Sequence, residues 1–304
     1  SGLYPLPASP FTPGVEGAGV VAVLGAGVEG LAVGDRVAYI TRPPCGSYGE
    51  FCAVPYGRVV RTPAGLSSQV AAASMIQGMT ATALVTLAYP VKAGDTVLVT
   101  AAAGGTGGLV AQLASAAGAT VIGTASTPEK AEIARQAGCA HVILYTEQDL
   151  AAEVLRLTGG RGVAAVYDGV GASTFDAGLA CLARLGWMVS YGNASGKVRG
   201  ASILTLTWSS VAQVADVDIL RLSRNNVRLM RPALWGFVET KEDFEALASQ
   251  TLAAVAEGRL RVRRMCVRVT ARYPLERAAE AHRDLESRGT TGKLLLLPPT
   301  AAAV

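Results

Sequence analysis

The chain is poor in residues that bind metals. Among its 304 residues are only two histidines, His141 and His282, and there is no C-x-x-C pair. Its five cysteines are scattered: Cys45, Cys52, Cys139, Cys181 and Cys266. Zinc sites need clusters of such ligands, so we expect neither a metal nor a disulfide framework. This cysteine usage favours a reducing compartment, and we expect a cytoplasmic protein. Because the chain begins Ser1-Gly2 without methionine, any targeting signal ahead of it lies outside this sequence.

Charged residues and long apolar runs are also scarce. Only 16% of the residues are charged and 50% are hydrophobic, a balance that suits a large α/β core. The apolar runs break at glycine, proline or polar residues before about 18 positions, so we expect a soluble protein without a membrane-spanning helix. The formal charge is +4, and its main local source is the arginine-rich segment 259–272. Near-alternation of arginine with apolar residues favours a strand with one solvated face over a nucleic-acid patch, so we expect no nucleic-acid partner.

The pattern along the chain predicts two closely packed domains, because its length exceeds the usual single-domain size of about 100–200 residues without any linker-like segment. Short β-type runs at 19–24, 36–40 and 49–54 predict an antiparallel, barrel-like unit. The apolar spacing then becomes helical from Ser67 to Ala88. These two patterns assign the first part of the chain to a β domain that ends in a helix.

From Thr96 onward, β and α patterns alternate, as is typical of a parallel, doubly wound Rossmann sheet. The predicted strands are 96–100, 120–124, 141–144, 163–168 and 187–192, and the predicted helices between them are 108–117, 128–137, 148–158 and 174–182. Past Pro232, a helix at 241–257, the arginine-rich strand, a helix at 275–287 and a strand at 293–297 return to the first domain. The predicted fold class is α/β, with a Rossmann sheet beside a mainly antiparallel, partly barrel-like β domain.

The segment 97–110 predicts a phosphate-binding turn. An apolar run passes through Gly104, Gly105, Thr106 and Gly107 directly into a helical pattern. Glycines let backbone N–H groups approach a pyrophosphate, and the helix start favours its negative charge. The first glycine of the G-x-G-x-x-G fingerprint is replaced by Ala102, so an ordinary glycine-rich turn is the alternative.

The next strand indicates which cofactor binds. NAD-specific domains carry an acidic residue about 20 positions past the glycines, on the adenine ribose. Here the strand runs into Ser126 and Thr127 without an acid, and Lys130 follows in the first turn of the next helix. A hydroxyl and a cation at this place favour the 2′-phosphate of NADPH. The alternative for Lys130 is a solvated surface lysine.

Two further strand ends lie at the same predicted sheet edge, where open α/β sheets bind ligands. One carries Gly169 and Val170 and the other carries Tyr191, Gly192 and Asn193, which we interpret as cofactor contacts rather than simple turns. Asp168 precedes the first of these turns, and we expect it to cap the following helix or to brace the turn rather than to act as an acid.

With these residues in place, the chain resembles the zinc-independent, zeta-crystallin-like quinone oxidoreductases of the medium-chain dehydrogenase/reductase superfamily. The matching segments are 1–5, 13–19, 34–37, 101–107, 167–168, 192–196, 231–232 and 292–293. Val15 stands where zinc-dependent relatives would have the histidine of Gly-His-Glu, and no cysteine-rich lobe lies between Tyr39 and Tyr48.

The resemblance implies a GroES-like catalytic domain from 1–79 and 232–304 and an NADPH-binding domain at 80–231. It also implies that the first strands of the catalytic domain precede this sequence. It implies that Thr80 lies near the nicotinamide, that Ser126, Lys130 and Tyr145 surround the adenosine phosphate, and that Asn193 and Lys293 close over the cofactor. Tyr4, Tyr48 and Arg231 are its pocket candidates, and the tyrosines have alternatives in covering the core or occupying a turn.

The resemblance implies NADPH-dependent hydride transfer to a quinone. Reduction of a conjugated enone or alkenal double bond is the alternative, and a non-enzymatic NADPH- or RNA-binding protein is a third. Compared with the family's usual segment, the chain carries an apolar insert at 201–215. Three roles stay open for this insert: to extend a helix, to line the substrate mouth or to alter a dimer edge. The run 226–230 reads as an edge strand, and such strands commonly pair across a two-fold axis, so we expect a homodimer.

Overall fold

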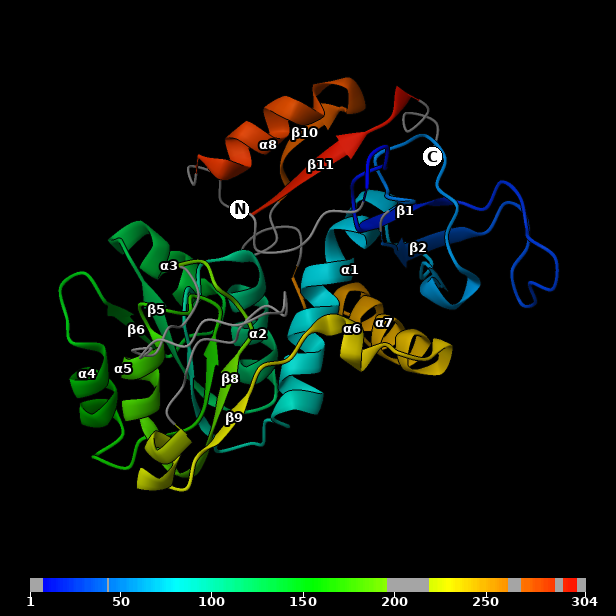
Figure 1. Ribbon diagram of the computed structural model, residues 1–304. Helices are drawn as coiled ribbons and strands as arrows, with labels where there is room; N and C mark the ends of the chain where they lie inside the picture. Colours follow the sequence, from blue (N-terminus) through cyan, green and yellow to red (C-terminus); the bar gives the residue numbers. More distant parts are fainter. Residues whose placement is uncertain (1–7, 43, 196–218, 262–268, 288–291, 300–304) are drawn as a thin grey trace, which may run out of the picture. The chain divides into compact units, whose positions relative to one another are not determined.

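The computed structural model describes residues 8–42, 44–195, 219–261, 269–287 and 292–299. The chain forms two compact units (Figure 1): unit 1 is Ser1–Thr82 with Leu234–Val304, and unit 2 is Ala83–Ala233. Both chain ends therefore belong to the same unit. Tyr4, Cys266, the insert at 201–215 and residues 262–268 of the arginine-rich segment lie outside the described residues.

Unit 2 is built on a six-stranded parallel sheet in the order β6-β5-β4-β7-β8-β9. Its strands are β4 (Thr96–Val99), β5 (Thr120–Ala125), β6 (His141–Leu144), β7 (Val163–Asp168), β8 (Leu182–Ser190) and β9 (Arg228–Met230). The order reverses between β4 and β7, which is the doubly wound Rossmann topology. The predicted fold class is confirmed, and the run predicted as an edge strand does form the outer strand β9.

Helices connect these strands: α2 (Gly105–Ala116), α3 (Pro128–Gln136), α4 (Leu150–Leu157), α5 (Phe175–Ala180) and the 3₁₀ turn η3 (Ile219–Arg224). The helix α2 packs on β4 and β5, and α3 packs on β5 and β6. A buried cluster joins Leu98, Ile122 and Val166 of the sheet to Val154 of α4 and Phe175 of α5. Burial of these apolar side chains on the sheet is the main force that holds the layers together.

Unit 1 contains an antiparallel sheet of β1 (Glu16–Val20), β2 (Arg36–Ile40) and β3 (Val59–Arg61), preceded at β3 by the 3₁₀ turn η1 (Tyr56–Arg58). A parallel pair, β10 (Val269–Pro274) and β11 (Lys293–Leu297), packs against α8 (Ala278–Glu286), which follows the 3₁₀ turn η4 (Leu275–Arg277). The remaining helices are α1 (Ser68–Ala83), α6 (Leu234–Phe237) and α7 (Lys241–Ala256). Thr240 and Asp243 form a capping box that begins α7.

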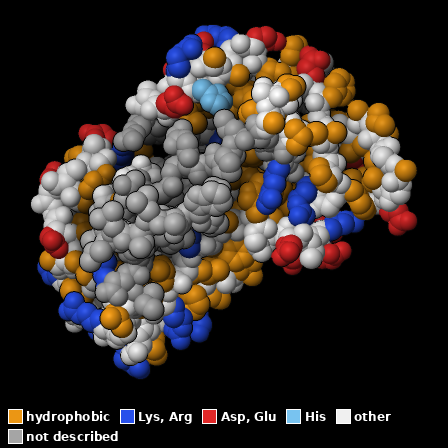
Figure 2. All heavy atoms as spheres, viewed as in Figure 1, with side chains coloured by type: hydrophobic (Ala, Val, Ile, Leu, Met, Phe, Trp, Pro, Cys, Tyr) orange, Lys and Arg blue, Asp and Glu red, His pale blue; other side chains and the backbone are white. Residues whose placement is uncertain are grey.

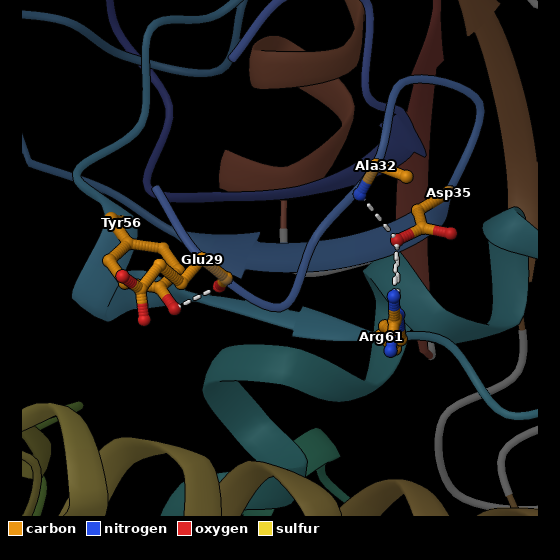
Figure 3. Close-up of polar contacts among 5 residues, drawn as sticks. All are labelled: Glu29, Ala32, Asp35, Tyr56 and Arg61. Carbon is orange, nitrogen blue, oxygen red and sulfur yellow. Dashed lines mark hydrogen bonds and ion pairs between the residues drawn. The ribbon is translucent and has the colours of Figure 1, made fainter. Parts of the chain in front are cut away.

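Polar contacts close the loop between β1 and β2 (Figure 3). The Asp35 carboxylate accepts hydrogen bonds from Ala32 N at 2.9 Å and from Arg61 Nη2 at 2.8 Å. In the same region the Tyr56 hydroxyl donates to the carbonyl of Glu29. The pKa of Asp35 is held below its ordinary value, first by the Ala32 N–H and then by Arg61. These contacts tie the loop to β3 and to the turn before it.

Two strand predictions in unit 1 are wrong. The run predicted at 49–54 forms no strand, although its side chains alternate between exposed and half-buried from Phe51 to Val54. No strand pairs with this segment in the part of the chain that the structure describes, and the third strand of the sheet is β3 instead. Likewise β1 covers Glu16–Val20 rather than 19–24, because Val20 already pairs with Arg36 at the start of β2.

The helical stretch predicted at 67–88 forms as expected, but its length and apolar composition correct one expectation. By length and composition alone, Ser68–Ala88 is long and apolar enough to cross a membrane. The polar residues Gln77 and Thr80 interrupt the apolar run in the sequence, but the helix continues through them. It comprises α1 and a π-helical turn, Leu84–Ala88. Its apolar window is 61% buried inside the structure, as in a core helix. The expectation that no such stretch exists is therefore corrected.

Candidate nucleotide-binding site

The glycine turn joins β4 to α2. Gly104 is extended at the helix start and its N–H donates to Ala101 O at 2.8 Å. The first-turn N–H groups of Gly105, Thr106 and Gly107 have no intrahelical acceptors, as at any helix start. They and the helix dipole suit an anion such as a pyrophosphate.

Close packing explains which positions of the turn need glycine. A Cβ on Gly107 would lie 2.6 Å from Ala101 O, so a side chain there would force the helix away from the turn. Ala102 replaces the first glycine of the fingerprint and is fully buried. Its methyl group fits because β5 carries Gly123 opposite, where a Cβ would lie 2.8 Å from the Ala102 Cβ.

The loops after β5 and β6 come together at the predicted adenosine end. Thr146 Oγ1 donates to Ser126 O at 3.3 Å, and Tyr145 N donates to Ala125 O at 3.3 Å. Thr127 caps α3 by accepting from Lys130 N at 3.3 Å. Tyr145 is 48% exposed, beside the capped turn. The structure thus brings Ser126, Lys130 and Tyr145 to neighbouring strand ends.

Lys130 is a cation at the N-terminal end of a helix, which is an unusual position for a positive charge. It lies in the first turn of α3, where the helix dipole disfavours a cation. Neither its ammonium nor the Ser126 hydroxyl has a hydrogen-bond or ion-pair partner in the part of the chain that the structure describes. A half-buried cation and a hydroxyl that lack partners are free to bind a phosphate.

The loops after β7 and β8 also meet. A Cβ on Gly192 would lie 2.1 Å from Gly169 O, so their backbones touch. Ser195 N donates to Val170 O at 2.8 Å. Tyr191 is half-buried, and burial raises the pKa of its hydroxyl, with a smaller contribution from Asp168. Its hydroxyl is therefore protonated at neutral pH.

Arg231 braces the second of these loops. Its Nη1 donates to Ser190 O at 2.7 Å and to Gly192 O at 3.1 Å. With the Asn193 amide oriented to satisfy both of its ends, Asn193 Oδ1 accepts from Arg231 Nη2 at 2.9 Å. Arg231 therefore holds the segment that carries Gly192 and Asn193.

Asp168 is fully buried at the end of β7. Its Oδ1 accepts from Thr100 Oγ1 at 2.9 Å, from Val170 N at 3.0 Å and from Thr174 Oγ1 at 2.7 Å. It braces the turn, as expected. The sequence missed Thr100, since a threonine at the end of a strand reveals no partner on another strand.

The other predicted residues belong to unit 1. The Thr80 hydroxyl donates to Ile76 O of its own helix at 2.6 Å. Lys293 forms an ion pair with Glu16, and the second carboxylate oxygen of Glu16 accepts from Ile76 N at 2.8 Å. Lys293 is therefore bound within unit 1.

Tyr48 has a partner that the sequence did not indicate. Its hydroxyl lies 3.0 Å from His282 Nε2, and the two rings pack edge to face with centroids 5.8 Å apart. Burial, followed by the charge of Glu16, raises the Tyr48 pKa. His282 lies 234 positions away on α8, a separation at which local sequence gives no signal.

The reversed strand order and the glycine turn at a helix start define unit 2 as a dinucleotide-binding domain. Two family models match the chain: "Alcohol dehydrogenase GroES-like domain" at residues 1–64 and "Zinc-binding dehydrogenase" at 105–239. The chain belongs to the quinone oxidoreductase family of the medium-chain dehydrogenase/reductase superfamily.

Three similar proteins support this assignment. The quinone oxidoreductase of Pseudomonas aeruginosa is 38% identical over 298 residues, covering 98% of this chain and 85% of the relative. The crystal structure of Escherichia coli quinone oxidoreductase complexed with NADPH has a TM-score of 0.86 and 37% identity, covering 98% of this chain and 85% of that chain. The 2-haloacrylate reductase of a Burkholderia species is 37% identical, covering 95% of this chain and 81% of the relative.

The description of one family model names zinc, and the residues that the structure describes do not fit that metal. Nowhere in the described ranges do three or more His, Cys, Asp or Glu side chains gather. Val15 supplies no ligand, and the described cysteines Cys45, Cys52, Cys139 and Cys181 belong to no such cluster.

Proposed function

We propose that the chain transfers a hydride from NADPH to a quinone. The observation that carries the proposal is the end of β5, where Ser126 and Lys130 lack partners among the described residues and no acidic residue follows the strand. A cation and a hydroxyl stabilise a 2′-phosphate, whereas a carboxylate at the strand end would repel it. Two similar proteins support the proposal: one is named a quinone oxidoreductase, and the other is a quinone oxidoreductase whose structure contains NADPH.

NADPH supplies the hydride when it is bound. The chain's contribution is to bind and orient it: the helix start at Gly105 stabilises the pyrophosphate, and the close packing of the Gly169 and Gly192 loops on each other fixes the sheet edge beside it. The reduced quinone oxygen also takes up a proton. Tyr48 is the proposed pocket donor, since a tyrosine hydroxyl is protonated at neutral pH and this one lies 3.0 Å from His282 Nε2.

The remaining assignments follow from the same proposal. Residues 1–79 and 232–304 form the catalytic domain, and 80–231 form the cofactor domain. The contacts proposed for NADPH are those of the turn (Gly104, Gly105, Thr106, Gly107), the adenosine end (Ser126, Lys130, Tyr145) and the later loops (Gly169, Val170, Tyr191, Gly192, Asn193), with Thr80 at the start of the cofactor domain and Lys293 from the catalytic domain. Tyr4, Tyr48 and Arg231 are the proposed pocket residues.

The proposed partners are a small-molecule substrate and a second copy of the chain, in the cytoplasm. On the face shown in Figure 2, Lys and Arg side chains lie in several small groups among acidic and apolar ones. A dispersed charge of this kind does not form the basic stripe that nucleic acids need. The RNA-binding alternative therefore has no support on this face.

Reduction of a conjugated double bond is the second candidate, because a 2-haloacrylate reductase is among the similar proteins. The test is the rate of NADPH oxidation with 1,4-benzoquinone against 2-cyclohexenone and 2-chloroacrylate. The proposal predicts a kcat/KM at least about tenfold higher for the quinone, a difference of about 1.4 kcal/mol in transition-state binding. If only the two alkenes are turned over, the quinone proposal is wrong and a conjugated alkene is the substrate.

A further inference from the structure

The two halves of the parallel sheet meet between β4 and β7. In a doubly wound domain each half binds one mononucleotide, and the dinucleotide crosses the point where the strand order reverses. Here β4, β5 and β6 form the first half, and β7, β8 and β9 form the second. Thr100 ends the β4 side and Asp168 ends the β7 side, so they face each other across this point.

A side-chain hydrogen bond spans the gap. Thr100 Oγ1 donates to Asp168 Oδ1 at 2.9 Å and accepts from Gly169 N at 3.0 Å. Both residues have no exposed surface. In such a dry site a carboxylate that loses a donor is not compensated by water, so this bond contributes more than it would on the surface.

Asp168 in turn forms hydrogen bonds to the loops of the second half. Its carboxylate also accepts from Val170 N at 3.0 Å, and its backbone carbonyl accepts from Tyr191 N at 2.8 Å. On the other side of the turn, Ala101 N donates to Thr124 Oγ1 at 3.1 Å, which ties the turn to β5. Thr100 is thus the side chain through which the phosphate-binding turn is joined to the loops after β7 and β8.

We propose that the Thr100–Asp168 hydrogen bond is a latch that holds the loops of the second half in register with the phosphate-binding turn. Thr100 is then a positioning residue that sets the affinity for the whole dinucleotide but not for its adenosine half. The inference rests on the proposed NADPH function. It assigns a role to a side chain that need not touch the cofactor.

The test compares Thr100→Val, which removes the hydroxyl at constant size, with Thr100→Ser, which keeps it. Isothermal titration measures the Kd of NADPH and of adenosine 2′,5′-bisphosphate, which represents the adenosine half. Thr100→Val is expected to raise the NADPH Kd about tenfold, as for loss of one hydrogen bond to a buried charge, and to leave the bisphosphate Kd within about twofold. Thr100→Ser is expected to restore NADPH binding.

The matched control is Thr174→Val, because the Thr174 hydroxyl donates at 2.7 Å to the same Oδ1 atom from within the second half. Its NADPH Kd is expected to stay within about twofold of the wild type. Equal losses in Thr100→Val and Thr174→Val, or equal losses for both ligands, would overturn the latch. A wild type that binds neither ligand would contradict the proposed function itself.

Thermal unfolding of each unliganded variant separates binding from folding. If Thr100→Val does not fold, Thr100→Ala replaces it, since alanine also lacks the hydroxyl and adds no bulk. An NADPH Kd equal to that of the wild type in a folded variant without the hydroxyl would overturn the latch.

Discussion

At the scale of single residues, opposite charges meet in the first turn of α3. Lys130 is the proposed ligand of the 2′-phosphate, and Glu129 precedes it. The Thr127 hydroxyl donates to Glu129 and holds the pKa of that carboxyl below its usual value. Glu129 is therefore ionised at neutral pH and opposes an additional phosphate charge.

Glu129→Gln is accordingly expected to tighten NADPH binding, by about twofold to threefold as for an exposed charge, and to leave NADH binding unchanged. Titration at low and high salt measures the effect, which salt should reduce. An equal gain for both cofactors would show that Glu129 does not act on the 2′-phosphate.

The fit of Gly107 leads to a second prediction. Gly107→Ala places a Cβ 2.6 Å from Ala101 O and 3.0 Å from Thr100 O, so the turn must shift. We expect a loss of about 1–3 kcal/mol in the free energy of unfolding, with weaker NADPH binding. Gly236→Ala is the control, because nothing lies within 4 Å of a Cβ at that position. Chemical denaturation of both variants measures the difference, and an unchanged Gly107→Ala protein would contradict the packing argument.

The sequence predicts residues of the site only where a single short segment contains the whole motif. The glycine turn and the acid-free end of β5 could be found because their chemistry is local. Three other features depend on partners from distant strands: the compensation of Ala102 by Gly123, the Thr100–Asp168 bond and the Tyr48–His282 pair. A single sequence does not specify such partners.

At the scale of elements, the central strands follow closely from their apolar patterns. The predicted bounds of β2, β6, β7 and β11 match the structure to the residue. Strands that are buried on both faces appear in the sequence as short apolar runs, and turn-forming residues mark their ends clearly. The segment 49–54 misled because alternation reports which side chains are exposed, whereas a strand also requires a neighbour with free N–H and C=O groups.

The loop between β1 and β2 offers a prediction of pH dependence. The lowered pKa of Asp35 means that its contribution to stability is present above the unfolded value and is lost as the pH falls through the folded value, below 3.8. We expect Asp35→Asn to unfold at a lower denaturant midpoint than the wild type at pH 7, and the gap to close below pH 3.8.

Denaturant titrations of the wild type and Asp35→Asn across this pH range measure the gap. Glu50→Gln serves as the control, since Glu50 is exposed and has no partner among the described residues. A gap that persists unchanged in acid would mean that the Asp35 charge does not stabilise the loop.

At the scale of the whole molecule, the chain order explains why a unit can be assembled from both ends. Unit 2 is a continuous segment with its own sheet and core, so it interrupts unit 1 without sharing strands with it. The alternation of β and α patterns made the continuous unit easy to predict. Unit 1 was harder, because the pairing of β10 with β11 and the closure of the loop by Asp35 join segments that carry no common pattern.

Among the described residues β9 is the outer strand of the six-stranded sheet, and we expect a second copy to pair with it. An edge strand leaves backbone groups unpaired, and pairing with a second copy across a two-fold axis satisfies them. We expect light scattering to give twice the chain mass of 31.1 kDa at micromolar concentration. A monomer mass that persists at high concentration would contradict the expected homodimer.

The assignment of Lys130 to the 2′-phosphate and that of a quinone as substrate are tested together by the steady-state oxidation of NADPH and NADH with 1,4-benzoquinone. The wild type is compared with Lys130→Ala and with Arg135→Ala, a matched removal of a cation from the last turn of the same helix. We expect the wild type to prefer NADPH, Lys130→Ala to lose about tenfold or more of this preference, and Arg135→Ala to keep it. Equal use of both cofactors by the wild type, or an unchanged preference in Lys130→Ala, would contradict the assignment of Lys130.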